Sequence, residues 1–246
     1  MKRVLRVLYQ PYKWFVFLPL FISSTIFFVG LGAVIVALKG SAAANRTTGV
    51  WWARFNAFIT PLWLTVYGKE NIDKNQSYVI VSNHQSLYDI FVLYGWLGID
   101  IKWVMKKELR KVPVFGYAGQ KGGNIYIDRS NPAAAVTSLN KAKDVLKNGT
   151  SVIILPEGTR SLSGNLIEFK KGAFVLALDL GMPILPITII NTRNILPPKT
   201  FDLFPGRATM AIHHPVDVSA YRRESIDRLV ADIKGTIQSG LDQFSS

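Results

Sequence analysis

The pair formed by His84 and Asp89, in the segment NHQSLYD at residues 83–89, is the first candidate site for chemistry. A β-rich run precedes it, so His84 falls where a strand gives way to a helix, and active sites of open α/β sheets gather at such strand ends. Asp89 can fold back to accept the ring N–H of His84, which would fix the tautomer and stabilise the imidazolium. A histidine with a pKa of about 6.5 can then remove a hydroxyl proton at neutral pH. In the alternative interpretation His84 only caps the helix, and Asp89 lies at its dipole-favoured start.

A second candidate lies in the segment LPEGTRS at residues 155–161, which ends another β-rich run. It places the carboxylate of Glu157 and the guanidinium of Arg160 on a tight loop, at the sheet edge where His84 is expected. The planar fork of arginine binds phosphate at two points, and backbone N–H groups nearby can assist. An ordinary surface turn is the alternative.

A third segment, GGNIYIDR at residues 122–129, ends a further strand in the charged pair Asp128 and Arg129. Arg129 would bind phosphate or pair with Asp128. Each of these loops is weak evidence when it is taken alone, whereas the three together favour an active site that handles a phosphate.

The elements that position these loops alternate after Gly68 between short β-rich runs and amphipathic helical runs, which predicts an α/β domain with a largely parallel sheet. Strands are expected at Tyr78 to Ser82, Lys102 to Met105, Asn124 to Ile127, Ser151 to Leu155, Ile184 to Ile190 and Arg207 to Ile212. Helices are expected at Ser86 to Leu97, from Asn131-Pro132 to Gly149, at Lys171 to Leu180 and from Ile226 to Leu241.

The N-terminal segment predicts a membrane anchor. Residues 14–38 carry no charge, and a helix of that length would reach about 37 Å, enough to cross a bilayer. A second apolar stretch at residues 50–66 gathers its tryptophans and other apolar side chains on one helical face, which suits an interfacial helix, although packing on a domain core is the alternative. The apolar run is longer than a signal-peptide core, and Lys39 interrupts the approach to the small residues after it. We therefore expect membrane-anchoring helices over residues 1–68 and an α/β catalytic domain over residues 69–246.

The charge distribution indicates an anionic membrane as the partner. The chain of 246 residues has 29 Lys and Arg against 16 Asp and Glu, a net charge of +13. Residues 1–69 hold eight basic residues and no acidic one. Since this charge coincides with the apolar, tryptophan-rich part, a lipid surface is favoured and nucleic acid is not expected. The absence of cysteine excludes disulfides, thiolate catalysis and cysteine-bound metal.

Together the motifs resemble the glycerolipid acyltransferases, specifically the 1-acylglycerol-3-phosphate acyltransferases of bacteria and organelles. Four blocks match in order: N-H-x-x-x-x-D at residues 83–89, G-x-x-F-I-D-R at 123–129, F-P-E-G-T-R-S at 155–161 and V-P-I-x-P-V at 182–187. Leu155, Met182 and Ile187 are among the departures, all of which are apolar swaps or fall at variable positions. The resemblance covers about residues 69–215 and implies the family's sheet flanked by helices.

The resemblance also implies a reaction. His84 would deprotonate the sn-2 hydroxyl of lysophosphatidic acid, which attacks an acyl thioester directly to give phosphatidic acid, and Asp89 would orient His84. The acceptor site would comprise Lys106, Arg129, Glu157, Gly158, Thr159 and Arg160. No cofactor or metal is implied, and acyl-CoA or acyl carrier protein would be the donor. The enzyme would work at the inner membrane of the cell, with its site facing the cytoplasm.

Three other interpretations stay open at this point. The first is a related acyltransferase with another acceptor, such as a lysophospholipid that carries a head group or an amine-bearing lipid. The second is a membrane-bound phosphatase or hydrolase, with or without a metal, although the remaining histidines, His213 and His214, lie far along the chain at the end of an expected strand and are interpreted as structural. The third is a protein without catalysis that binds lipid or nucleic acid through its charge.

Overall fold

A mixed β-sheet lies at the centre of the protein. The computed structural model describes residues 7, 9–128, 146 and 149–244. Within them the sheet has seven strands in the order β1-β7-β6-β2-β5-β3-β4, and only the β6–β7 pair is antiparallel. The strands are β1 (Leu62–Tyr67), β2 (Val79–Ser82), β3 (Asp100–Lys106), β4 (Ile125–Ile127), β5 (Thr150–Ile154), β6 (Ile184–Ile190) and β7 (Gly206–Ile212). The predicted α/β class with a largely parallel sheet is confirmed.

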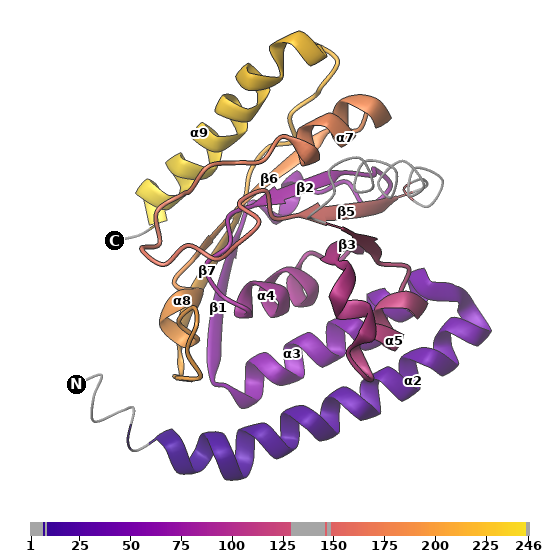
Figure 1. The fold of residues 1–246 in the computed structure, drawn as a ribbon, viewed down its shortest axis with the longest axis vertical. Helices are drawn as coiled ribbons and strands as arrows, with labels where there is room; N and C mark the ends of the chain where they lie inside the picture. The colour runs from indigo at the N-terminus through magenta and orange to yellow at the C-terminus, as the bar shows by residue number, and fades with distance from the viewer. Residues whose placement is uncertain (1–6, 8, 129–145, 147–148, 245–246) are drawn as a thin grey trace.

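Helices cover both faces of this sheet (Figure 1). On one face α4 (Tyr88–Trp96) packs against the strands, with α3 (Val50–Ile59) and then α2 (Leu18–Ala44) outside it. On the other face lie α7 (Gly172–Leu180) and α9 (Ile226–Phe244). Two shorter helices, α5 (Phe115–Lys121) and α8 (Thr192–Ile195), follow strands β3 and β6.

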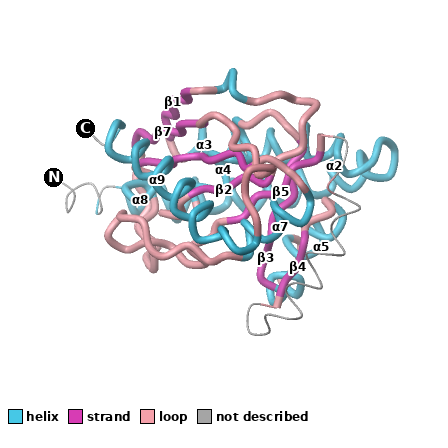
Figure 2. The backbone as a smooth tube through the Cα atoms, turned by 90° about the horizontal axis from the view of Figure 1, so that it is seen from above, coloured by secondary structure: helices cyan, strands magenta, loops and turns pink. Residues whose placement is uncertain are grey.

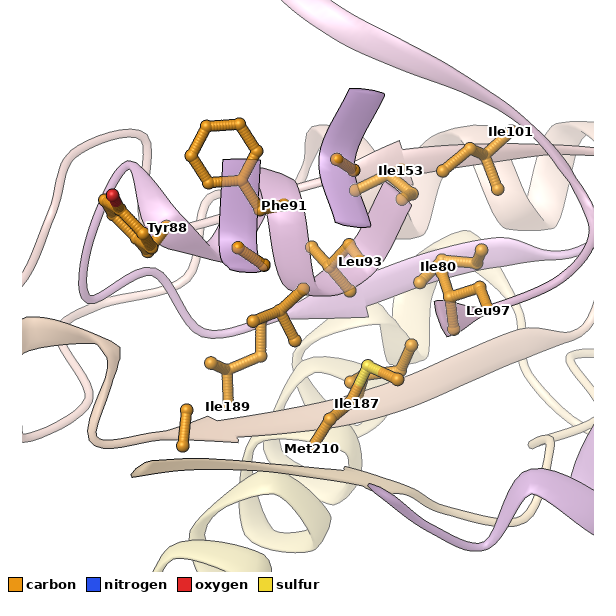
Figure 3. Close-up of a cluster of buried hydrophobic side chains, with 14 of the residues drawn as sticks. Ile80, Tyr88, Phe91, Leu93, Leu97, Ile101, Ile153, Ile187, Ile189 and Met210 are labelled. Atoms are coloured by element: carbon orange, nitrogen blue, oxygen red, sulfur yellow. The ribbon is translucent and has the colours of Figure 1, made fainter. Parts of the chain in front are cut away.

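The alternation of side chains along the buried strands builds two cores. In β2, Ile80 belongs to the cluster beneath α3 and α4, whereas Val79 and Val81 belong to the cluster beneath α7 and α9. Ile187 of β6 and Leu93 of α4 join the first cluster with Ile80 (Figure 3). Because successive side chains of a strand point to opposite faces, a central strand covered on both faces is apolar throughout. This is why the segment before His84 has the sequence YVIVS.

The N-terminal segment folds as a helical hairpin that is docked on the domain. Helical structure extends from Tyr9 to Ile59 and is long and apolar enough to cross a membrane, judged by length and composition only. It is broken at Gly40, where φ is 82° and ψ is 170°, and α3 returns alongside α2 (Figure 1). The ring of Phe21 on α2 contacts Phe91 on α4, with 6.4 Å between ring centroids. The hairpin is thus packed against the core along α2.

The structure corrects the predicted helix over residues 50–66. The helix ends at Ile59, and β1 begins at Leu62 and pairs with β7 in parallel. Pro61 lies between them, and a proline lacks the amide hydrogen that would continue a helix. The domain boundary expected near Gly68 therefore falls after a strand that already belongs to the sheet. The helix expected between Asn131 and Gly149 lies almost wholly outside the described residues.

One of the basic residues expected to face lipid is instead buried. The side chain of Lys13 is 9% exposed, and its Nζ donates to the carbonyl oxygen of Phe201 at 3.0 Å. Burial of a charged amine is tolerated because the ammonium gains this acceptor and lies over the ring of Trp14. Lys13 therefore holds the start of the hairpin against the domain.

Candidate active site

The parallel strands carry the candidate loops to one edge of the sheet. Strands β2, β5 and β3 lie side by side (Figure 2), and Val81 of β2 pairs with Ile154 of β5. Continuing this register past the strand ends places His84 opposite Glu157. The expectation that both loops share one edge is confirmed, because the backbone N–H of His84 donates to Glu157 Oε1 at 2.9 Å.

His84 and Asp89 form the contact that the sequence predicts. The ring Nδ1 of His84 lies 2.7 Å from Asp89 Oδ2, and Asp89 is completely buried. The same oxygen accepts the backbone N–H groups of Gln85 at 2.7 Å and Ser86 at 2.9 Å. Since an ionised carboxylate only accepts hydrogen bonds, Nδ1 carries the proton and Nε2 is the basic nitrogen. The first turn of α4 therefore holds the imidazole in the tautomer that general-base catalysis needs.

Glu157 ties the two loops together. Its side chain is 3% exposed, and Oε1 accepts the N–H of His84, while the N–H of Ser161 donates to the carbonyl of His84 at 2.9 Å. Burial raises the pKa of Glu157 from 4.5 to about 7, and the hydrogen bonds from His84 and Ile167 oppose the rise. The backbone of His84 is thus held on both sides by the loop that contains Glu157.

We expect Glu157→Gln to change how stability depends on pH. The folded-state pKa lies above the unfolded one, so the stabilisation is complete below pH 4.5 and is lost as the pH rises through about 7. At about 1.36 kcal/mol per unit of pKa, the wild-type protein should lose on the order of 3 kcal/mol of unfolding free energy over this range relative to Glu157→Gln. Urea unfolding of both proteins in detergent, repeated from pH 4.5 to above 7, measures the difference. If the unfolding free energies of the two proteins differ by the same amount at every pH in that range, the raised pKa of Glu157 is contradicted.

The remaining predicted acceptor residues that the structure describes lie at the same edge of the sheet as His84. Lys106 is at the end of β3, is about half exposed, and lines the same cavity as His84. Gly158 has a φ of 68°, a backbone conformation that favours glycine and produces the tight loop on which Thr159 is exposed and Arg160 is half-buried. Arg129 lies outside the described residues.

An apolar cavity of about 320 Å³ begins at His84 and extends between the hairpin and the sheet. Its walls include Phe28, Gly32 and Val36 from α2, and Trp103 and Met105 from β3. A cavity of this size and character accommodates a hydrocarbon chain. Sequence reasoning did not find these wall residues, because they depend on how α2 packs on the domain.

The sequence also gave no signal for a further contact of Asp89. The hydroxyl of Thr192 donates to Asp89 Oδ1 at 2.5 Å across 103 residues of chain. His213, in contrast, lies away from this site between β6 and α9, where its Nε2 is 2.8 Å from the hydroxyl of Thr188. This position agrees with its interpretation as structural.

Comparisons with known proteins identify the kind of protein that carries this site. The family model described as Acyltransferase matches residues 64–190. The crystal structure of the 1-acyl-sn-glycerophosphate (LPA) acyltransferase PlsC from Thermotoga maritima superposes with a TM-score of 0.83 and 26% identity, covering 100% of this chain and 98% of that one. The protein is thus an α/β transferase by fold and by motif. It belongs to the acyltransferase family.

Curated relatives carry a more specific name. A chloroplastic 1-acyl-sn-glycerol-3-phosphate acyltransferase of Brassica napus is 36% identical over 66% of this chain and 51% of its own length. A protein of the same name from Pseudomonas aeruginosa is 37% identical over 65% of this chain and 63% of its own length. The chain therefore spans about half to two thirds of the length of these relatives.

Proposed function

We propose that this protein transfers a fatty acyl group from acyl-CoA or acyl carrier protein to the sn-2 hydroxyl of lysophosphatidic acid, giving phosphatidic acid. The observation that carries the proposal is the His84–Asp89 pair at the wall of an apolar cavity, with Lys106 lining the same cavity. The named relatives support the choice of substrate.

In the proposed reaction, each atom of the site has a part. Nε2 of His84 takes the proton of the acceptor hydroxyl, and the hydroxyl oxygen attacks the thioester carbonyl carbon. As the tetrahedral intermediate collapses, the carbon–sulfur bond breaks and the imidazolium returns its proton to the thiolate. Asp89 stabilises the imidazolium between these two steps. The acyl chain lies in the apolar cavity, and because the acceptor oxygen attacks the thioester directly, no covalent acyl-enzyme forms.

Lys106 and Arg160 are the described cations that we assign to the acceptor phosphate. Arg129 keeps its predicted role here as a further phosphate ligand. An arginine can bind two phosphate oxygens at once, whereas a lysine acts as a point charge. A lipid with a bare phosphate is therefore favoured over one whose head group masks it.

We expect Arg160→Ala to weaken acceptor binding more than turnover. Loss of a charge-assisted hydrogen bond costs about 1.5–3 kcal/mol, which corresponds to a rise of roughly 10- to 150-fold in the KM for lysophosphatidic acid. Initial rates at varied acceptor concentration measure this KM and kcat. Arg228→Ala removes the same charge from the exposed surface of α9, on the far face of the sheet, and serves as the control. An unchanged KM in Arg160→Ala removes this residue from the phosphate site.

The hairpin supports attachment to a membrane by one leaflet. Its outer surface exposes large apolar side chains, and the most exposed are Phe15, Phe58 and Leu38. A hairpin that lies in one leaflet keeps the contacts of α2 with the domain, such as that of Phe21 with Phe91 on α4. We place the hairpin in the surface of the inner membrane, with the domain and its water-soluble donor on the cytoplasmic side. Nucleic acid has no part in this function.

A panel of lysolipids offered to the purified protein in vesicles tests the acceptor. Lysophosphatidic acid should react fastest, and lysolipids with head groups should react more slowly, because the head group masks the phosphate. A preference for head-grouped or amine-bearing acceptors contradicts the proposal.

Adding a chelator tests the alternative of a metal-dependent hydrolase. Activity that a chelator removes and a divalent ion restores would favour that alternative.

A further inference from the structure

The turn that follows β6 contacts the general-base pair through Thr192. This side chain is completely buried, and its hydroxyl donates to Asp89 Oδ1 at 2.5 Å. The other carboxylate oxygen of Asp89 accepts His84 Nδ1 and two backbone N–H groups. The terminal torsion of an aspartate is soft, so a donor on each oxygen fixes the plane of the carboxylate. Without the hydroxyl of Thr192, a buried acceptor would lose its partner.

Two further contacts attach the loop of His84 to this turn and to the strand before it. The hydroxyl of Ser86 donates to the carbonyl of Leu196 at 2.7 Å. The side-chain amide of Asn83 donates to the carbonyl of Ile189, near the end of β6, at 2.8 Å. It also accepts the N–H of Ile189 at 2.7 Å. These contacts lie on either side of Thr192 along the chain. The turn is therefore held relative to His84 by contacts other than that of Thr192.

The next residue, Arg193, reaches the loop that continues from Arg160. Its guanidinium donates to the carbonyl of Leu162 at 2.7 Å and also to the carbonyl of Ser163. Gly164 lies so close to this guanidinium that a Cβ there would collide with it, and its φ of 91° also favours glycine. The loop between Arg160 and residue 165 is thus shaped around Arg193.

We propose that residues 191–196 form a positioning element for the whole site, in which Thr192 orients Asp89 and Arg193 orients the acceptor loop. Neither residue touches substrate in this account, so both are positioning residues. The two contacts come from neighbouring residues, yet they serve different steps. Thr192 acts on proton transfer, and Arg193 acts on the loop that binds phosphate. The inference rests on the proposed function and deepens it.

The kinetic test separates the two contacts. Thr192→Val keeps the shape of the side chain and removes the hydroxyl, and we expect it to lower kcat by about 10- to 100-fold with little change in the acceptor KM, as losses of supporting hydrogen bonds do at other sites. Thr192→Ser restores the hydroxyl and should recover kcat. Arg193→Ala should raise the acceptor KM and leave kcat within about threefold, because the two hydrogen bonds that it removes lie at the surface and hold only the loop. If Thr192→Val does not fold, Thr192→Ala removes the same hydroxyl.

A second readout needs no substrate. The protein has three histidines, so labelling them with ¹⁵N allows the Nδ1 proton of His84 to be followed by NMR. We expect a slowly exchanging resonance in the wild type, Thr192→Ser and Arg193→Ala, and its loss or broadening in Thr192→Val. An unchanged resonance and an unchanged kcat in Thr192→Val overturn the positioning role, as does a kcat that Thr192→Ser fails to recover. An unchanged acceptor KM in Arg193→Ala overturns the proposal that Arg193 orients the acceptor loop. A wild-type protein that keeps this resonance but forms no phosphatidic acid contradicts the proposed function instead.

Discussion

Replacing His84 with alanine is expected to lower kcat for acyl transfer by about 10²–10⁴-fold, the usual contribution of a positioned general base. The reason is that Nε2 of His84 is the basic nitrogen, while Nδ1 is held by Asp89 at 2.7 Å. Alanine cannot accept the hydroxyl proton, but it leaves the hairpin and the cavity in place. Binding to lipid vesicles should therefore be retained. Initial transfer rates and vesicle sedimentation of the same preparation measure both quantities.

His214→Ala is the matched control for this experiment. His214 is an exposed histidine after β7, so the change removes an imidazole without altering the site. Its activity should match that of the wild type. Transfer activity in His84→Ala at the wild-type level would refute the general-base role and would favour the interpretation of the protein as a lipid-binding module.

The second large effect is expected from Asp89→Asn. Asp89 Oδ2 accepts His84 Nδ1 and the N–H groups of Gln85 and Ser86. If the amide nitrogen of asparagine faces these donors, the ring is no longer held in the tautomer with the proton on Nδ1. If the amide oxygen faces them, it accepts the hydrogen bonds but carries no negative charge, so the imidazolium loses its counterion. We expect kcat to fall by about 10²–10⁴-fold. The acceptor KM should change little, because Asp89 is buried behind the imidazole.

Asp242→Asn on α9 controls for the loss of one negative charge. A KM that rises while kcat is preserved in Asp89→Asn would contradict the orienting role and would point to a part in acceptor binding. Unfolding in urea, measured in parallel, separates a loss of folded protein from a loss of turnover.

Much of the fold follows from local pattern. The segment YVIVS before His84 is apolar on both faces of a central strand, and α7 ends at Leu180 as predicted, with Gly181 after it in a left-handed conformation. Strand β1 was not predicted, because residues 50–66 carry aromatic side chains at helical spacing and the strand is defined by its pairing with β7. That pairing brings together residues far apart in the chain, so no local sequence pattern predicts it.

The site divides in the same way. The contact of His84 with Asp89 closes over five residues, so their spacing favoured it together with the other motifs, with helix capping by His84 as the alternative. Glu157 meets the N–H of His84 through the register of β2 and β5, which the sequence does not fix. Thr192 reaches Asp89 across 103 residues, and the cavity exists because α2 packs over β3. These features depend on tertiary structure, so they became visible only in the folded protein.

The central claim is that a lipid hydroxyl, activated by His84, attacks the thioester directly. The measurement that tests it most directly follows labelled lysophosphatidic acid and free thiol together, with purified protein in vesicles and either acyl-CoA or acyl carrier protein as donor. We predict that phosphatidic acid and thiol form in equal amounts with at least one donor, and that thiol is released only when the acceptor is present. Thiol release without acceptor, or no phosphatidic acid with either donor, would contradict it.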